Sequence, residues 1–154
     1  MLTRAQDFNE AKDRFHRSNE GVKTAREAYG RVQTDFKANV ELLRSVGCRI
    51  QDVYGGITML VGDSVVLTVQ CQFPHVNSLE NTALVAQFYD GVPLLPGLSV
   101  FKEPRTLKKW QFKFELVGPG RSGWVGPDRK AHAPEALAEF LLKHFLELQQ
   151  RRLG

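Results

Sequence analysis

The sequence predicts an α+β protein with a long N-terminal helix, an antiparallel sheet of about five strands and a C-terminal helix packed on that sheet. Three patterns predict this class. Apolar residues recur at spacings of three and four in residues 8–46, alternate one by one in several segments between residues 57 and 116, and surround a narrow polar line in residues 134–153. The first and third patterns are typical of helices, and the second is typical of half-buried strands.

The chain of 154 residues is expected to divide into a helical part, residues 1–47, and one globular domain, residues 48–154. Charge is uneven along it. Residues 1–49 carry ten Lys and Arg against seven Asp and Glu, residues 50–101 carry four acids and no base, and residues 102–154 carry eleven bases against six acids. The resulting net charge of +4 is too mild to require a nucleic-acid partner.

The N-terminal helix is expected to carry a heptad seam, and the seam predicts a coiled coil. One column of the seam is bulky, and the column three residues later is mostly small. We expect two copies of the chain to pair here in antiparallel orientation, because each bulky side chain then meets a small one, with Phe15 against Ala25 and Tyr29 against Ala11. The predicted pairing residues are Phe8, Ala11, Phe15, Val22, Ala25, Tyr29 and Val32.

Two features of this helix stay open at the level of sequence. A break near Ser18–Gly21, with Ser18 or Asn19 as the cap of a second helix, is an alternative to one continuous helix. The heptad phase is the same on both sides of Gly21, which favours continuity. The seam could also be intramolecular, with the helix folded back against the C-terminal helix. From Phe36 onward the apolar stripe widens, which predicts that this end of the helix lies on the chain's own core and sheet. The wide surface consists of Phe36, Val40, Leu42, Leu43 and Val46.

Alternating segments predict the strands of the sheet. Residues 57–66 indicate a hairpin with Gly62 and Asp63 at its turn, residues 82–91 a further strand, residues 98–102 a short strand, and residues 107–116 a strand with one apolar face. The C-terminal helix is predicted to span Pro134–Leu153, since proline suits a first helical turn. One core is expected to join the sheet to this helix, through Val65, Leu67, Val69, Trp110, Phe112, Phe114, Leu141 and Phe145.

No segment is apolar over the roughly 20 residues that a membrane-spanning helix needs, so no membrane partner is expected. The N-terminus lacks the apolar region of a signal peptide. Cys48 and Cys71 are too few for a disulfide framework or a four-cysteine zinc site, and their apolar neighbours predict buried free thiols. We therefore expect a cytoplasmic protein.

No residue set with the spacing of a catalytic, metal-binding or cofactor-binding motif occurs in the sequence, so we expect no cofactor and no metal. The four histidines, His16, His75, His132 and His144, have no partner at motif spacing. His16 is expected on the outer side of the long helix, and His144 is expected to be solvated or to cap a polar edge beside Lys143. His75 follows a strand and could face a cleft, but the favoured interpretation is a structural loop histidine. The leading hypothesis is a non-enzymatic interaction or assembly protein, whose partner is a second copy of itself or another protein.

The glycine-rich segment of residues 118–130 supports a second hypothesis, a nucleic-acid-binding module. Backbone amides, cations and an aromatic side chain could form an anion site there, with contacts from Lys108, Lys109, Lys113, Arg121, Trp124, Arg129 and Lys130. The favoured interpretation is instead a hairpin turn and a connecting loop, in which Trp124 anchors a short edge strand to the core. A third hypothesis is a small-molecule binder or enzyme with a pocket between the sheet and the helices.

Overall fold

The structure, a computed structural model, describes residues 4–53, 55–92 and 104–153. Three helices come first, α1 (Arg4–His16), α2 (Asn19–Lys37) and α3 (Val40–Ser45). The strands and the last helix follow, in the order β1 (Arg49–Val53), β2 (Ile57–Val61), β3 (Val66–Gln72), β4 (Ala83–Tyr89), β5 (Thr106–Gly118), β6 (Arg121–Val125), β7 (Ala131–His132) and α4 (Pro134–Leu153). The bounds predicted for the C-terminal helix are confirmed.

Within the described residues the sheet contains seven strands in chain order, each antiparallel to the next. The α+β class and the antiparallel sheet are thus confirmed, and the predicted number of about five strands is wrong. β1 was not predicted because Arg49, Gln51 and Asp52 leave little apolar alternation in its five residues. β7 has only two residues. The strand predicted for residues 98–102 lies outside the described residues.

The strand β5 connects the two parts of the sheet. Its first half pairs with β4, where Phe112 lies opposite Leu84. Its second half pairs with β6, where Phe114 lies opposite Trp124. Because side chains alternate along a strand, Phe112 and Phe114 project to the same face as Trp110. This face is the one that the helices cover.

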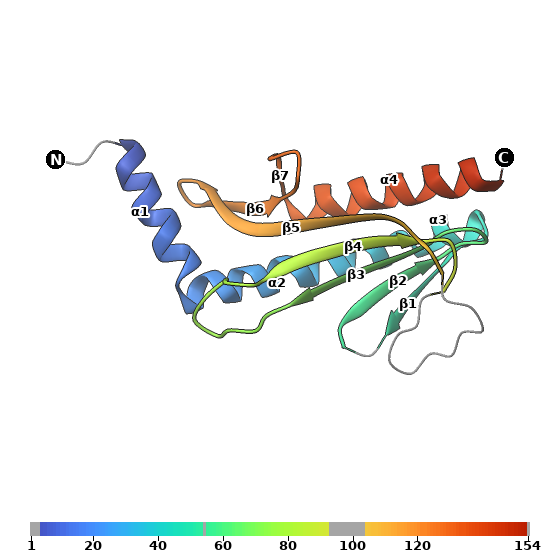
Figure 1. The fold of residues 1–154 in the computed structure, drawn as a ribbon, viewed down its shortest axis with the longest axis horizontal. Coiled ribbons are helices and arrows are strands. Elements are labelled where there is room, and N and C mark those ends of the chain that lie inside the picture. Colours follow the sequence, from blue (N-terminus) through green and yellow to red (C-terminus); the bar gives the residue numbers. More distant parts are fainter. Residues whose placement is uncertain (1–3, 54, 93–103, 154) are drawn as a thin grey trace.

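The core lies between the sheet and the helices α2 and α4, which pack on the same face (Figure 1). All eight residues predicted to share one core belong to it, and Trp110 is the only one of these eight that is partly buried rather than buried. α2 contributes Val22, Ala25, Tyr29, Val32 and Phe36, and all of these are buried. Since α4 contacts both the sheet and α2, its apolar circumference is covered on two sides.

The N-terminal residues form three helices, so the prediction of one long helix over residues 1–47 is wrong. Ser18 caps α2, accepting a hydrogen bond from the Gly21 amide at 2.9 Å and donating one to the Phe15 carbonyl at 2.9 Å. This break is the alternative indicated by the sequence around Ser18. A second break at Ala38 and Asn39 precedes α3. There Leu42 and Val46, expected on the core, are 47% and 48% exposed.

α1 leaves the body of the molecule at an angle to α2 and runs alongside the tip of the β5–β6 hairpin (Figure 1). Two hydrogen bonds fix the junction to the connection between β3 and β4. The Leu79 amide donates to the His16 carbonyl at 2.8 Å, and the Asn19 side-chain amide donates to the Val76 carbonyl at 3.0 Å. The angle between α1 and α2 is therefore held by the fold.

Candidate functional site

The predicted seam is divided between two environments. Val22, Ala25, Tyr29 and Val32 are buried in the chain's own core. The Tyr29 hydroxyl lies 2.6 Å from the Gly56 carbonyl oxygen and 3.1 Å from that of Val69, and burial raises the pKa of this phenol. The expected pairing of Phe15 with Ala25 and of Tyr29 with Ala11 between two copies does not fit this burial. The three seam residues of α1 remain at the surface, each half-buried: Phe8, Ala11 and Phe15.

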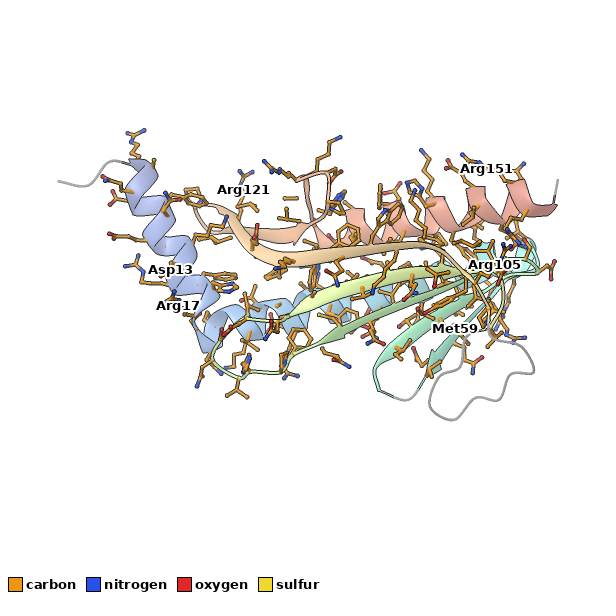
Figure 2. The ribbon with its side chains drawn as sticks, in the orientation of Figure 1. Asp13, Arg17, Met59, Arg105, Arg121 and Arg151 are labelled. Atoms are coloured by element: carbon orange, nitrogen blue, oxygen red, sulfur yellow. The ribbon has the colours of Figure 1, made fainter. Side chains whose placement is uncertain are left out.

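The residues predicted as anion or nucleic-acid contacts do not form one surface. Trp124 is 0% exposed and packs on Phe114 with ring centroids 4.9 Å apart, so its indole is not accessible to a base. It anchors β6 to the core, as the favoured interpretation expects. Lys109 and Lys113 lie on the sheet face opposite the helices, because they alternate with the core residues of β5. Arg121 projects from the β5–β6 hairpin (Figure 2), and Arg129 and Lys130 are exposed between β6 and β7.

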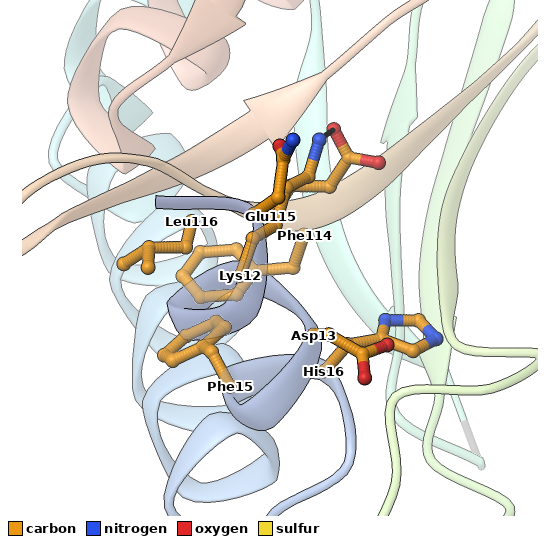
Figure 3. Close-up of a pocket in the computed structure, with 8 residues that line it drawn as sticks. Lys12, Asp13, Phe15, His16, Phe114, Glu115 and Leu116 are labelled. Carbon is orange, nitrogen blue, oxygen red and sulfur yellow. Dashed lines mark ion pairs between the residues drawn. The ribbon is translucent and has the colours of Figure 1, made fainter. Parts of the chain in front are cut away.

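A groove of about 290 Å³ lies between α1 and β5 (Figure 3). Phe15 contacts Phe114 across its floor, with ring centroids 6.1 Å apart, and Leu116 extends this apolar surface. At the rim the Lys12 ammonium lies 3.8 Å from the Glu115 carboxylate. Both side chains are partly exposed, at 44% and 33%, so solvent screens the ion pair and it adds little to stability.

A second cavity, of about 200 Å³, has aromatic walls and lies between β5, the β6–β7 connection and α4. Phe140 of α4 is the central ring of these walls. Its ring centroid lies 5.2 Å from that of Trp110, 5.2 Å from that of His132 and 4.6 Å from that of His144. Phe112, Pro127 and Asp128 complete the wall. The Nε2 atom of His132 is buried and has no hydrogen-bond partner among the described residues.

His144 separates this aromatic cavity from a charged one of about 180 Å³. The charged cavity is lined by Lys108 of β5 and by Glu147 and Arg151 of α4, above Phe88 and Leu148. The Lys108 ammonium lies 4.5 Å from the centroid of the Trp110 ring. Burial lowers the pKa of His144, and the nearby Lys108 lowers it further. The sequence-based expectation for His144 missed this environment, since its neighbours come from distant segments.

The described residues contain no cluster of three His, Cys, Asp or Glu side chains that could hold a metal ion. Both cysteines are free and buried, as predicted. Burial raises the pKa of Cys71 to about 12, so its thiol is protonated at neutral pH and is a poor nucleophile. Within the described ranges, every helix is too short or too polar to cross a membrane.

No known protein family, no curated protein and no solved structure matches this chain.

Proposed function

We propose that this protein is a non-enzymatic assembly protein that self-associates through α1. The observation that carries the proposal is the packing of α1. None of the thirteen residues of this helix is buried, although Phe8, Ala11 and Phe15 form an apolar stripe along it. The other helices long enough to pack, α2 and α4, bury their stripes in the core.

The spacing of the stripe suits an antiparallel pair of α1 helices. Ala11 is small and permits close approach of two backbones at a two-fold axis. Phe8 and Phe15 lie three and four residues to either side of Ala11, so the axis brings each Phe8 beside Phe15 of the second copy. Phe15 lies in the groove against β5, which offers this Phe8 an apolar surface.

Charges along α1 favour the same orientation. The first half of the helix holds Arg4, Asp7 and Glu10, with a net charge of −1. The second half, through the junction, holds Lys12, Asp13, Arg14 and Arg17, with a net charge of +2. An antiparallel pair sets each negative half beside a positive half, whereas a parallel pair sets like charges together.

The junction between α1 and α2 lowers the conformational entropy that is lost in this association. The hydrogen bonds of His16 and Asn19 to the β3–β4 connection hold α1 at one angle before a partner arrives. A surface that is ordered in advance loses less conformational entropy on binding. One short helix per copy buries a small area, at the low end of specific interfaces (below about 1,200 Å²), so we expect weak and concentration-dependent dimers.

Paired substitutions on α1 test the proposal. Phe8→Glu with Ala11→Glu would place charges in the pair interface and is expected to yield a folded monomer, because neither side chain belongs to the core. Lys23→Glu on an exposed position of α2 is the control, since it changes the net charge by the same amount. Sedimentation and circular dichroism would report mass and folding. A double variant that is folded and associates like the wild type would reject α1 as the interface.

A further inference from the structure

The aromatic cavity is lined by rings that come from β5, β7 and α4. These rings are Trp110, Phe112, His132, Phe140 and His144. The Trp110 and His144 rings meet edge to face, with centroids 4.9 Å apart, and divide this cavity from the charged one. A ligand of the aromatic cavity therefore has to fit within its own walls.

We propose that the aromatic cavity binds an uncharged small molecule with a single aromatic ring. The ring packs between Trp110, Phe112 and Phe140, and a polar substituent lies at the opening of the cavity to solvent. The cavity shares no residue with the groove beside α1, so this binding does not depend on self-association.

The volume of the cavity limits the size of the ligand. A dry apolar cavity of about 150 Å³ is known to hold one benzene molecule. At about 200 Å³, the aromatic cavity has room for one ring with a short substituent. It is smaller than the pockets of roughly 300 Å³ or more that bind drug-sized ligands. The ligand is therefore a compound with one ring.

The walls favour an aromatic ring over an aliphatic ring of similar volume. The Phe140 ring lies at 82° to Phe112 with centroids 6.4 Å apart, and at 38° to Trp110 with centroids 5.2 Å apart. Rings at such angles present both faces and edges, and edge-to-face or offset contacts with a further ring add to the free energy gained from burial. Trp110 and Phe140 are only partly buried, so a ring packed against them also removes apolar surface from water.

The charges around the cavity favour an uncharged ligand. Asp128 lines the cavity but is exposed to solvent, and its carboxylate already accepts a hydrogen bond from the Lys130 amide at 3.0 Å. Lys108 and Arg151 line the charged cavity, on the other side of His144. A ligand charge buried among the rings would lose hydration without gaining a close partner, and an uncharged ring avoids this loss.

The connection from β6 to β7 fixes one wall of the cavity before a ligand binds. The Arg129 amide donates a hydrogen bond to the Gly126 carbonyl at 2.9 Å, and the Lys130 amide donates to Asp128. Gly126 lies directly against Phe112, since an added Cβ would meet that ring at 2.7 Å. A wall that is ordered in advance reduces the conformational entropy lost on binding.

Titration with matched probes tests the site. We expect benzyl alcohol to shift the indole N–H NMR signal of Trp110 with a Kd of about 1–10 mM, in keeping with the affinity of so small a ligand. The indole signal of Trp124 should stay unchanged, because Trp124 is buried against Phe114 outside the cavity. Cyclohexylmethanol, with an aliphatic ring, should bind at least about 3-fold more weakly. Benzylammonium and benzoate should also bind at least about 3-fold more weakly.

Each probe can overturn one part of the assignment. An unchanged Trp110 signal at about 30 mM benzyl alcohol would overturn the site itself. Equal or tighter binding of cyclohexylmethanol would overturn the aromatic ring, and equal or tighter binding of either ion would overturn the uncharged ligand.

Matched variants test whether the ring walls bind the probe. Phe140→Leu removes one wall ring and keeps an apolar side chain at a partly buried position, so it should fold and bind benzyl alcohol at least about 5-fold more weakly. Phe73→Leu is the control, because Phe73 is also partly buried and lies outside the cavity. Circular dichroism reports folding. A folded Phe140→Leu protein with the wild-type Kd would contradict the proposal, and if this variant does not fold, the probe series on the wild type decides.

Discussion

The side-chain oxygen of Gln149 on α4 accepts hydrogen bonds from the turn between β2 and β3. Its Oε1 atom accepts hydrogen bonds from the Ser64 amide at 3.1 Å, the Val65 amide at 3.0 Å and the Ser64 hydroxyl at 3.2 Å. The side chain lies directly against Gly62, where an added Cβ would meet Oε1 at 2.5 Å. Gln149 is only 5% exposed, so water does not replace these bonds. The residue therefore joins the last helix to the β2–β3 hairpin of the sheet.

Gln149→Leu is expected to destabilise the protein by about 1–3 kcal/mol, because the amides of Ser64 and Val65 lose their acceptor in a buried position. Gln150→Leu is the control, since Gln150 is exposed and should change stability by less than about 0.5 kcal/mol. Urea denaturation of both variants measures the difference. A Gln149→Leu protein as stable as the control would show that these bonds contribute nothing.

Burial of His144 makes stability depend on pH. The pKa of this side chain is lowered, first by burial and then by Lys108, while Glu147 raises it and Lys143 and Arg151 lower it. The unfolded chain has the ordinary histidine pKa of about 6.5, so it binds the proton more readily than the folded chain does. Stability contributed by neutral His144 is therefore present above that value and is lost as pH falls below it.

His144→Phe should reduce this pH dependence while keeping a ring against Trp110 and Phe140. The free energy of unfolding of the wild type should fall more between pH 7.5 and pH 5 than that of the variant. His75→Phe, at an exposed loop position, should keep the wild-type slope. Identical slopes for the wild type and His144→Phe would mean that His144 is protonated as easily in the folded chain as in the unfolded one.

At the scale of elements, two glycines of α2 have opposite roles. A Cβ at Gly21 would lie 2.1 Å from the Phe15 carbonyl oxygen, because the end of α1 crosses closely over the start of α2. A Cβ at Gly30 would have no described atom within 4 Å. Gly21 is thus required by the close approach at the break between the helices. Gly30 lowers the stability of the helix and meets no such requirement, because the space beside it is open.

Gly21→Ala is expected to destabilise the protein by about 1–3 kcal/mol, since the clash is with backbone and the junction must shift. Gly30→Ala is expected to stabilise it by about 0.5–1 kcal/mol, the difference between glycine and alanine in a helix. Thermal or urea denaturation of the two single variants provides the comparison. Equal effects of the same sign would refute the distinct roles of the two positions.

The helices and strands could be predicted wherever one periodic pattern ran without a competing local signal. Pro134 and the apolar circumference after it defined α4, and alternation along residues 107–116 defined most of β5 and its core face. The N-terminal helix was predicted too long because the heptad phase continues unchanged through Ser18. The break there depends on local features, the Ser18 cap and the close contact at Gly21, which a periodic pattern does not record. The stripe of α2 has the spacing of a seam because it packs on a sheet and on α4.

At the scale of the whole molecule, the aromatic cavity and the exposed stripe of α1 both follow from contacts between distant segments. The aromatic cavity joins Trp110, His132 and Phe140, which come from β5, β7 and α4. Each of these residues alone resembles an ordinary core or edge residue, so sequence periodicity could predict a core there and could not predict a cavity. The division of the seam between the core and α1 likewise depends on the angle at Ser18.

Light scattering on the unmodified protein over a range of concentrations tests self-association through α1. Pairing of α1 predicts that the weight-average mass rises from 17.4 kDa toward twice that value between about 5 and 100 µM. Because the pairing of α1 combines apolar contact with opposite charges, high salt should weaken the dimer without abolishing it. A mass that stays at 17.4 kDa up to about 100 µM would rule out self-association through α1.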